Sequence, residues 1–282
     1  MAEHWKGAPV AQALTERLIR QAGRLKVQGI VPTLAIMRVG ERPEDLSYER
    51  GALKRCEKVG IHVKRFNLPE EAKQEELLEI IEKINADREI HGCLLFRPLP
   101  RHMDEEAVCA ALDPAKDVDG ITAGSLAAVF TGSGAGYPPC TAQACMEILE
   151  HYGCDLTGKR AVVVGRSLVV GKPLAMLLLG KNATVTLCHT RTADLAAECR
   201  RAEVLIAAAG AANMIGRDHL APGQLVLDVG INVDEEGNLV GDVDFAAADE
   251  VAAAITPVPG GVGAVTTSVL AAHVLQAAEQ IG

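Results

Sequence analysis

Short hydrophobic runs and longer amphipathic segments alternate along this chain. Most of the short runs are nearly continuous and rich in β-branched residues, as in strands that a parallel sheet buries on both faces. They cover residues 33–39, 61–66, 92–96, 161–164, 183–188, 203–208, 225–229 and 254–256. The amphipathic segments repeat hydrophobic residues at helical spacing. They predict helices over residues 8–28, 45–59, 75–84, 141–152, 171–179 and 266–281. This alternation predicts an α/β fold with parallel sheets.

The stretch from residue 113 to residue 139 interrupts the alternation. It contains Asp-Pro and Asp-Gly turns and a run rich in Gly and Pro over residues 131–139. Such composition indicates a linker or an active-site loop. A second turn signal, around Glu236-Gly237, predicts a short hairpin over residues 234–239. The chain, at 282 residues, is long enough for two domains or for one large one.

The run over residues 161–164 leads into a candidate phosphate site. Gly165 ends the predicted strand, and Gly171 with Pro173 opens a helix. The free N–H groups and the positive dipole end of such a helix N-terminus favour a bound phosphate. The spacing differs from the G-x-G-x-x-G pattern of many dinucleotide folds, and an ordinary βα turn is the alternative. Gly210, after a later strand, adds a second small residue where a nucleotide can approach the backbone.

The end of the next strand bears on the choice of cofactor. NAD-selective folds place an acidic residue there for the ribose 2′-hydroxyl, whereas an Arg accommodates the 2′-phosphate of NADP. No carboxylate precedes Asp194 in this turn, while Arg191 and Arg166 can flank one phosphate, with Ser167 and Thr190 as hydroxyl donors. The alternative is that both arginines are solvated surface charges. The pattern favours NADP.

Composition excludes several classes of protein. The net charge is −9 and no basic tract occurs, which argues against binding to nucleic acid. No hydrophobic run approaches the ~18 residues of a membrane span, and the N-terminus lacks the layout of a signal or transit peptide. The eight cysteines are scattered without metal-ligand spacing, as in buried side chains of a reducing compartment. We therefore expect a cytoplasmic protein without a metal site.

Seven motifs occur in the order found in one family. They are Asp117-Val118-Asp119-Gly120, Pro139-Cys140-Thr141, residues 162–173, Ala183-Thr184-Val185-Thr186, Asp228-Val229-Gly230-Ile231-Asn232, Gly241-Asp242-Val243-Asp244-Phe245 and residues 256–263. Over essentially its whole length the chain resembles the methylenetetrahydrofolate dehydrogenase/methenyltetrahydrofolate cyclohydrolase family. This resemblance implies two α/β domains flanking a cleft, a role in one-carbon metabolism and a homodimer.

The same resemblance implies the domain bounds. Residues 1–140, completed by the C-terminal helix 266–282, correspond to a folate-binding catalytic domain. Residues 141–265 correspond to a Rossmann-type NADP-binding domain. The implied substrate is a reduced folate, whose methylene group gives a hydride to the nicotinamide.

The resemblance also assigns roles to individual residues. Tyr48 lies at the position whose ring stacks on the folate, Asp119 at the position that accepts pterin N–H groups, and Arg97 completes the catalytic set. The implied substrate loop comprises Pro259, Gly260, Gly261 and Val262. The implied cofactor-binding residues are Gly165, Arg166, Ser167, Gly171, Pro173, Thr190, Arg191, Gly210 and Ile231.

Simpler interpretations exist for two of these residues. Asp119 could belong to a plain turn, and Tyr48 could be a half-buried core residue. The Asp-Val-Asp-Gly run also resembles the start of a calcium loop, but the twelfth position from Asp117 is Ala128 rather than Glu.

Two positions depart from the family pattern. The family has a lysine four residues after the tyrosine, where this chain has Ala52, and a glutamine before the Pro-Leu-Pro triplet, where we place Arg97. Lys54 lies about 200° away from Tyr48 and Ala52 around the predicted helix and is no substitute. We therefore expect an NADP-dependent dehydrogenase whose cyclohydrolase activity is lost or weak. A fully bifunctional enzyme and a non-catalytic folate- or NADP-binding sensor are the alternatives.

Overall fold

The computed structural model describes residues 1–281, and the chain forms two compact units. The large-sheet unit consists of Met1–Gln12 and Thr141–Thr266. The small-sheet unit consists of Ala13–Cys140 and the segment that starts at Thr267. Gly282, the last residue of the predicted segment 266–282, lies outside the described residues.

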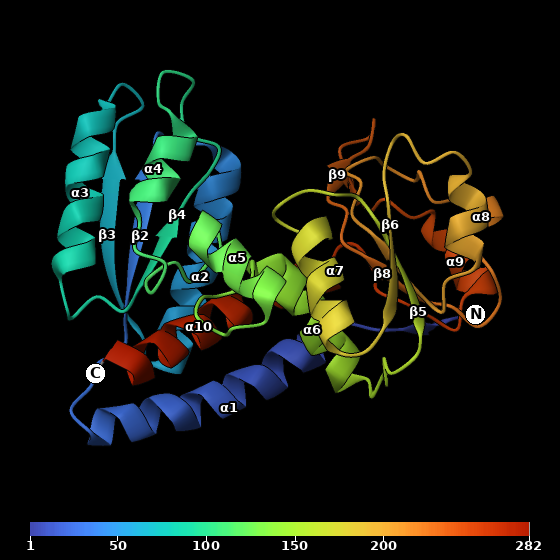
Figure 1. Cartoon of the computed structure of the whole chain (residues 1–282), viewed down its shortest axis with the longest axis horizontal. Helices are drawn as coiled ribbons and strands as arrows, with labels where there is room; N and C mark the ends of the chain where they lie inside the picture. Colours follow the sequence, from blue (N-terminus) through green and yellow to red (C-terminus); the bar gives the residue numbers. More distant parts are fainter. Residues whose placement is uncertain (282) are drawn as a thin grey trace. The chain divides into compact units, whose positions relative to one another are not determined.

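The small-sheet unit is built on three parallel strands in the order β3-β2-β4. Their bounds are β2 (Thr33–Val39), β3 (His62–Leu68) and β4 (Gly92–Leu95). Every residue of β2 and β4 is buried, as expected for strands covered on both faces. The sheet, with α3 (Gln74–Ala86), α4 (Glu105–Ala111) and α2 (Pro43–Val59) around it, is the left part of Figure 1. The unit also contains α10 (Thr266–Ile281) and most of α1 (Gly7–Val27).

The two faces of β2 have different chemistry. Ala35, Met37 and Val39 belong to a hydrophobic core that also contains Leu77, Ile81 and Ile84 of α3. Arg38 points to the opposite face, where its guanidinium meets α2. The core on the α3 side of this sheet is thus built mainly of hydrophobic side chains, and the other side contains the buried Arg38.

Helix α2, which contains Tyr48, has sequence signals at both ends. Pro43 occupies its first turn together with Glu44 and Asp45, whose negative charges favour a helix N-terminus. Gly60 ends the helix in the left-handed conformation at φ 92°, and its N–H donates to the carbonyl of Cys56. Both ends are fixed by local residues, which explains why this helix was predicted to within two residues.

Four short helices were not predicted. They are α4, α5 (Ala123–Thr131), α8 (Leu195–Arg200) and α9 (Phe245–Val251), each of six to nine residues. In all four, a side-chain oxygen of the N-cap residue accepts a backbone N–H, such as that of Ser125 by Thr122 at 3.1 Å. Helices this short have too few turns for a clear hydrophobic period. The predicted loop over residues 113–139 is therefore partly helical, since α5 lies within it.

The large-sheet unit contains six parallel strands in the order β1-β11-β8-β7-β5-β6. They are β1 (Glu3–His4), β5 (Arg160–Val164), β6 (Thr184–Cys188), β7 (Val204–Ala207), β8 (Leu225–Asp228) and β11 (Ala254–Ile255). Helix α7 (Gly171–Gly180) packs on β5 and β6, whereas α8 and α9 share a hydrophobic core on β5, β7, β8 and β11. The predicted hairpin is present as β9 (Asn232–Val233) and β10 (Leu239–Val240). The unit also contains nearly all of α6 (Cys140–His151).

The N-terminus differs from its prediction. The first residues were assigned with the N-terminal half of the chain, but β1 pairs with β11, with Glu3 opposite Ala254 and His4 opposite Ile255. Asp249 accepts hydrogen bonds from the backbone N–H of Ala2 and the ring of His4. The first twelve residues thus belong to the large-sheet unit, because β11 offers an edge whose N–H and C=O groups need partners.

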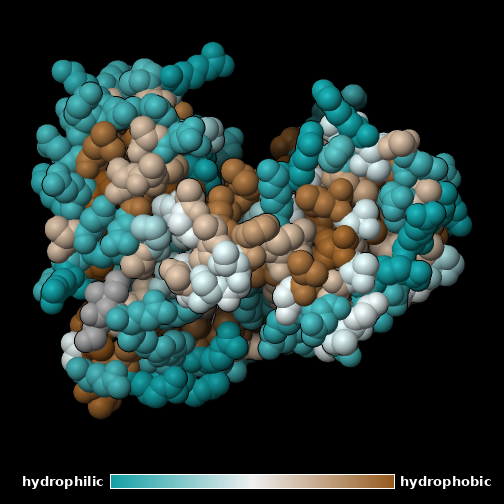
Figure 2. All heavy atoms as spheres, in the orientation of Figure 1, coloured by the Kyte–Doolittle hydropathy of each residue, from teal (hydrophilic) through white to brown (hydrophobic). Residues whose placement is uncertain are grey.

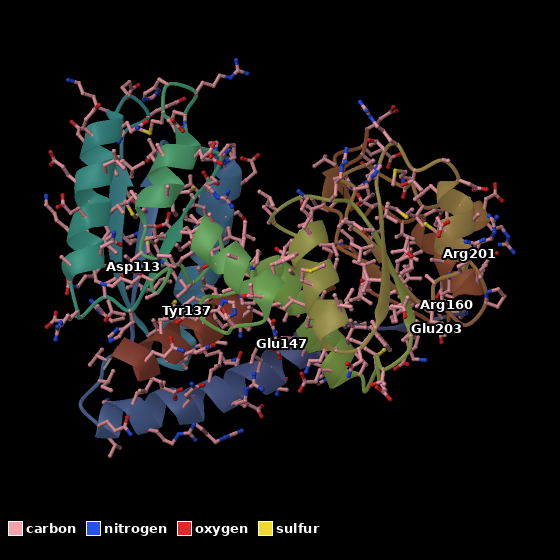
Figure 3. All side chains as sticks on the ribbon, in the orientation of Figure 1. Asp113, Tyr137, Glu147, Arg160, Arg201 and Glu203 are labelled. Atoms are coloured by element: carbon pink, nitrogen blue, oxygen red, sulfur yellow. The ribbon has the colours of Figure 1, made fainter. Side chains whose placement is uncertain are left out.

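The amino ends and the carboxyl ends of the strands form two opposite edges of the large sheet, and these two edges differ in chemistry. At its amino edge, Glu203 pairs with Lys159 at 3.3 Å and with Arg160 at 3.7 Å, and Figure 3 shows Arg160 and Glu203 together. At its carboxyl edge, β5 and β7 run into Gly165 and into residues 208–210. The carboxyl edge is therefore the one that leaves room for a ligand.

Charged residues cover the outer surface of several helices. Figure 2 shows mainly hydrophilic atoms over the visible faces of α1 and α8. Among residues 1–281, no helix combines the length and hydrophobicity that a membrane span needs.

Candidate cofactor and substrate sites

The carboxyl edge of the large sheet has a topological switch point at β5. Its successor β6 lies on one side of β5, and β7 lies on the other. Ligands of open α/β sheets bind at such a point, where the connections leave in opposite directions. Gly165 follows β5 with φ at 124°, and a Cβ atom there would collide with the carbonyl oxygen of Ala208. Gly171 is packed as tightly against the carbonyl of Gly165. Only glycine fits either position, so the turn before α7 keeps its close approach to the end of β7.

This turn leaves several backbone N–H groups without an acceptor. Ser167 accepts two bonds inside it, from Lys172 N at 3.1 Å to its carbonyl and from Val170 N at 3.1 Å to its hydroxyl. Within residues 1–281, the N–H groups of residues 166–169 and of Gly171 meet no hydrogen-bond acceptor. Together with the N-terminus of α7, where Pro173 occupies the first turn, they fit the phosphates of a dinucleotide.

Arg166 and Arg191 are exposed on the two turns that follow β5 and β6. The second turn is ordered by its own side chains, because Thr192 Oγ1 accepts the N–H of His189 at 2.9 Å and His189 Nδ1 accepts that of Arg191 at 3.1 Å. Thr190, within the same turn, is exposed. Neither arginine forms an ion pair in the described part of the chain, so both guanidinium groups are available to a phosphate. A solvated surface charge would look the same, so this observation does not decide between the two interpretations.

A cavity of about 300 Å³ lies at the end of β8 in the large-sheet unit. Its lining combines the residues after β8 with the loop over residues 257–264. It includes Pro259, Gly260, Gly261, Val262 and Ile231. The N–H of Gly7 donates to the carbonyl of Gly260 at 2.8 Å, so the N-terminal segment holds this loop. The structure thus brings together the four predicted substrate-loop residues and Ile231.

Tyr48 lies on α2 in the small-sheet unit, and its ring meets that of Phe96 edge to face with centroids 6.0 Å apart. Ala52, one turn later on the same helix, is completely buried. Arg97 instead pairs with Glu105, with 3.6 Å between Nη1 and Oε1. Phe96 is thus a neighbour of Tyr48, and Arg97 pairs with α4. Neighbouring side chains at a strand end point in different directions, and Phe96 is the one directed at α2.

A buried ion pair fixes the helix that presents Tyr48. The Nε atom of Arg38 donates to the Glu49 carboxylate at 3.1 Å, and both side chains are at least nine-tenths buried. Arg38 also donates to the carbonyl of Gly40. Because removing one partner would leave the other charge buried, this pair holds α2 in one position on β2.

Asp119 lies within a turn that the side chain of Asp117 stabilises. The carboxylate of Asp117 accepts the N–H groups of Ile121 at 2.9 Å and Thr122 at 2.7 Å. Gly120 has φ at 68°, and a Cβ atom there would overlap Pro139. Asp119 keeps some exposure, yet burial of its carboxyl group raises its pKa to about 6, against a hydrogen bond from Cys140 and the positive charge of Arg97.

Two residues beside Asp119 were not predicted as part of the site. The Nδ1 atom of His273, on α10, lies 2.8 Å from the carbonyl oxygen of Val118, and the thiol of Cys140 also donates to this oxygen at 3.5 Å. Tyr137 packs against His273 with ring centroids 5.2 Å apart. The Pro139-Cys140-Thr141 motif was a signal for Cys140, but His273 lies 155 positions from Val118 and had none.

Comparison with known proteins adds to this geometry. Residues 5–119 match the tetrahydrofolate dehydrogenase/cyclohydrolase catalytic domain, and residues 139–281 match the NAD(P)-binding domain of the same name. The chain is 50% identical over 272 residues to the bifunctional protein FolD of Clostridioides difficile, covering 96% of this chain and 95% of that protein.

Solved structures agree with the sequence matches. The bifunctional FolD methylenetetrahydrofolate dehydrogenase/cyclohydrolase of Campylobacter jejuni superposes with a TM-score of 0.96 at 37% identity, over 99% of both chains. The Trypanosoma brucei dehydrogenase-cyclohydrolase, solved with NADP and an inhibitor, gives 0.92 at 33% identity over 99% of this chain and 98% of that one.

Proposed function

Because the chain belongs to the tetrahydrofolate dehydrogenase/cyclohydrolase family, we propose that it oxidises 5,10-methylenetetrahydrofolate to 5,10-methenyltetrahydrofolate with NADP. The relatives carry the names of this activity, and one of them was solved with NADP. The sensor alternative is disfavoured because the relatives carry the names of enzymes.

The cofactor half of the proposal rests on the free donors after β5. NADP, when bound, accepts the hydride at its nicotinamide ring. The N–H groups of residues 166–169 and Gly171 bind its phosphates, and Arg166 with Arg191 binds the 2′-phosphate, with Ser167 and Thr190 as hydroxyl donors.

The folate half uses an aromatic ring and a carboxylate. Tyr48 stacks on the substrate, and the edge-to-face contact with Phe96 holds its ring. Asp119 accepts the N–H donors of the pterin, and the loop over residues 259–262 lets backbone atoms approach the ligands. Hydride transfer needs mainly such positioning, which can supply several kcal/mol of the barrier.

We propose further that hydrolysis of the methenyl product is lost or weak. One observation carries this: at the family's lysine position, one turn after Tyr48, stands Ala52, which is completely buried, and the ring of Phe96 also packs on Tyr48. Hydrolysis requires water to add and protons to move, and neither side chain titrates. The Arg97 guanidinium offers N–H donors and no acceptor, so it supplies charge but no group that takes up a proton. The loss of one general acid–base group costs roughly 10²–10⁴-fold in rate.

A fully bifunctional enzyme is the competing proposal, and the names of the relatives favour it. In that case water would be activated by another group near Tyr48. The two proposals agree on the dehydrogenase and differ only in whether the second step exceeds its spontaneous rate.

Parallel assays of the purified protein distinguish them. We expect NADP-dependent oxidation of methylenetetrahydrofolate, with methenyltetrahydrofolate hydrolysed at close to its spontaneous rate. Ala52→Lys should raise hydrolysis roughly 10²-fold. Ala52→Met is the matched control, because it adds similar bulk to the buried position without a titratable group. If the unmodified protein hydrolyses the product as fast as it forms NADPH, the loss of cyclohydrolase is wrong.

Domain roles, assembly and location stay proposals of the same family reasoning. We infer that the small-sheet unit binds folate and the large-sheet unit binds NADP. We also infer a cytoplasmic homodimer. Sedimentation of the purified chain tests the dimer.

A further inference from the structure

Two buried aspartates, Asp228 and Asp242, lie at the carboxyl edge of the large sheet. Asp228 ends β8 and is 3% exposed, and Asp242 follows β10 and is completely buried. No cationic side chain of residues 1–281 pairs with either carboxylate. Burying an unpaired charge is costly unless hydrogen-bond donors compensate it, so the donors around both groups are informative.

The carboxylate of Asp242 binds the loop after β7. Its Oδ2 atom accepts the N–H groups of Ala209 at 2.6 Å and Gly210 at 2.9 Å. Its Oδ1 atom accepts the N–H of Ala211 at 2.9 Å and the side-chain amide of Asn232 at 2.9 Å. One carboxylate therefore joins three successive backbone amides of the loop after β7 to Asn232, the residue that follows Ile231.

Asp228 holds the segment that carries Asp242. Its Oδ1 atom accepts the backbone N–H groups of Gly230 at 3.0 Å and Asp242 at 2.9 Å, and its Oδ2 atom accepts that of Val243 at 3.0 Å. A Cβ atom on Gly230 would collide with the Asp242 carboxylate, and one on Gly241 would collide with that of Asp228. Asp228, Gly230, Gly241 and Asp242 thus pack tightly on one another, and we call these four residues the clasp.

The clasp determines which backbone N–H groups at this edge are free to bind an anion. Three successive N–H groups that point to one spot form an anion-binding nest. In the loop after β7 this nest is filled by the chain's own carboxylate, whereas the amides of residues 166–169 have no acceptor within residues 1–281. Ala209 and Gly210 still expose their other side. The loop is therefore rigid and accessible but offers no free donors to a phosphate.

We propose that Asp242 is a positioning residue for the dinucleotide: it fixes Gly210 and Ile231 and blocks the second anion nest, so that the phosphates bind only at the turn before α7. The proposal rests on the proposed function, because it takes Gly210 and Ile231 as cofactor-binding residues. Asp242 acts through these residues and need not touch the cofactor.

The test compares Asp242→Asn with Asp234→Asn. Asp234 lies in the β9–β10 hairpin that precedes Asp242 and also accepts backbone N–H groups, from Glu236 at 3.0 Å and Asn238 at 2.7 Å. Among residues 1–281 its hydrogen bonds stay within this hairpin and do not reach the loop after β7. Asp242→Asn keeps the shape of the side chain but removes its charge. Its NH₂ group is then a donor that faces the backbone N–H donors of the loop after β7. We expect NADP to bind at least 10-fold more weakly to Asp242→Asn by calorimetry, with the folate KM within twofold and Asp234→Asn unchanged.

A second variant separates positioning from general damage. Asp242→Ala empties the nest, and added formate, a free carboxylate of the same charge, should restore part of the NADP affinity. Formate should leave the unmodified protein and Asp234→Asn unaffected. Inorganic pyrophosphate should occupy two sites per chain in Asp242→Ala and one in the unmodified protein.

Unchanged NADP affinity in Asp242→Asn would overturn the proposal, as would equal weakening of NADP and folate. Failure of the proposed function gives a different result. In that case the unmodified protein binds NADP in the calorimeter but forms no NADPH from methylenetetrahydrofolate.

Discussion

Acidification should destabilise the small-sheet unit through His273. This side chain is 5% exposed on α10, and its Nδ1 atom lies 2.8 Å from the Val118 carbonyl. That bond requires the Nδ1 proton, so acid would add a second proton at Nε2 in a buried environment. Burial lowers the pKa of His273 to about 4, although the Val118 carbonyl and the charge of Asp117 act in the opposite direction.

The sign and size follow from proton linkage. The unfolded chain binds a proton on this histidine below pH ~6.5, whereas the folded chain resists it down to about pH 4. The neutral histidine's contribution is thus fully present above pH ~6.5 and is lost as the pH falls toward 4. At about 1.4 kcal/mol per pH unit, the unfolding free energy should drop by roughly 2.5 kcal/mol between pH 7 and pH 4.5. This is a large share of the 5–15 kcal/mol typical of domains.

The assay is urea unfolding at pH 7 and pH 4.5, followed by circular dichroism. His273→Gln keeps a donor for the Val118 carbonyl but cannot titrate, so its loss between the two pH values should be smaller by roughly 2.5 kcal/mol. His62→Gln is the matched control because His62 is exposed on β3. The single tryptophan, Trp5, lies in the large-sheet unit and follows that unit independently. Equal losses in the unmodified protein and in His273→Gln would refute the reasoning.

Three further predictions concern the cofactor, the substrate and the stability of α2. Arg191→Ala should weaken NADP by about 1.5–3 kcal/mol and leave NAD nearly unchanged, with the exposed Arg201→Ala as control; equal loss for both cofactors would show that Arg191 does not contact the 2′-phosphate. Because the raised pKa of Asp119 is about 6, kcat/KM for the folate should fall as the pH drops below 6 and the acceptor becomes protonated. In Asp119→Asn that acid limb should disappear from the pH profile, and its persistence would assign it to another group. Gly60→Ala places a Cβ at φ 92° and should cost about 1 kcal/mol or more in urea unfolding, while an unchanged midpoint would mean that the cap adds nothing.

The sequence by itself determined the elements whose causes are local. The run before Gly165, the glycine turn and the start of α7 could be predicted because strand burial, glycine conformation and helix initiation each depend on a few neighbouring residues. Helix α2 was predicted from residue 45 to residue 59, and its observed ends are likewise local, with Pro43 at its start and Gly60 at its end. The parallel sheet followed from the alternation of strands and helices.

Only the tertiary structure decided which side chains meet. Glu3 and His4 have no hydrophobic pattern, and their pairing arises from the exposed edge of β11. The ring of Phe96 packs on Tyr48 and Arg97 pairs with Glu105, because α2 and α4 lie beside these two neighbouring positions. The Asp242 carboxylate bonds residues 10 to 33 positions away, and the contact between His273 and Val118 spans 155. Such contacts depend on where whole strands and helices lie, which no short stretch of sequence encodes.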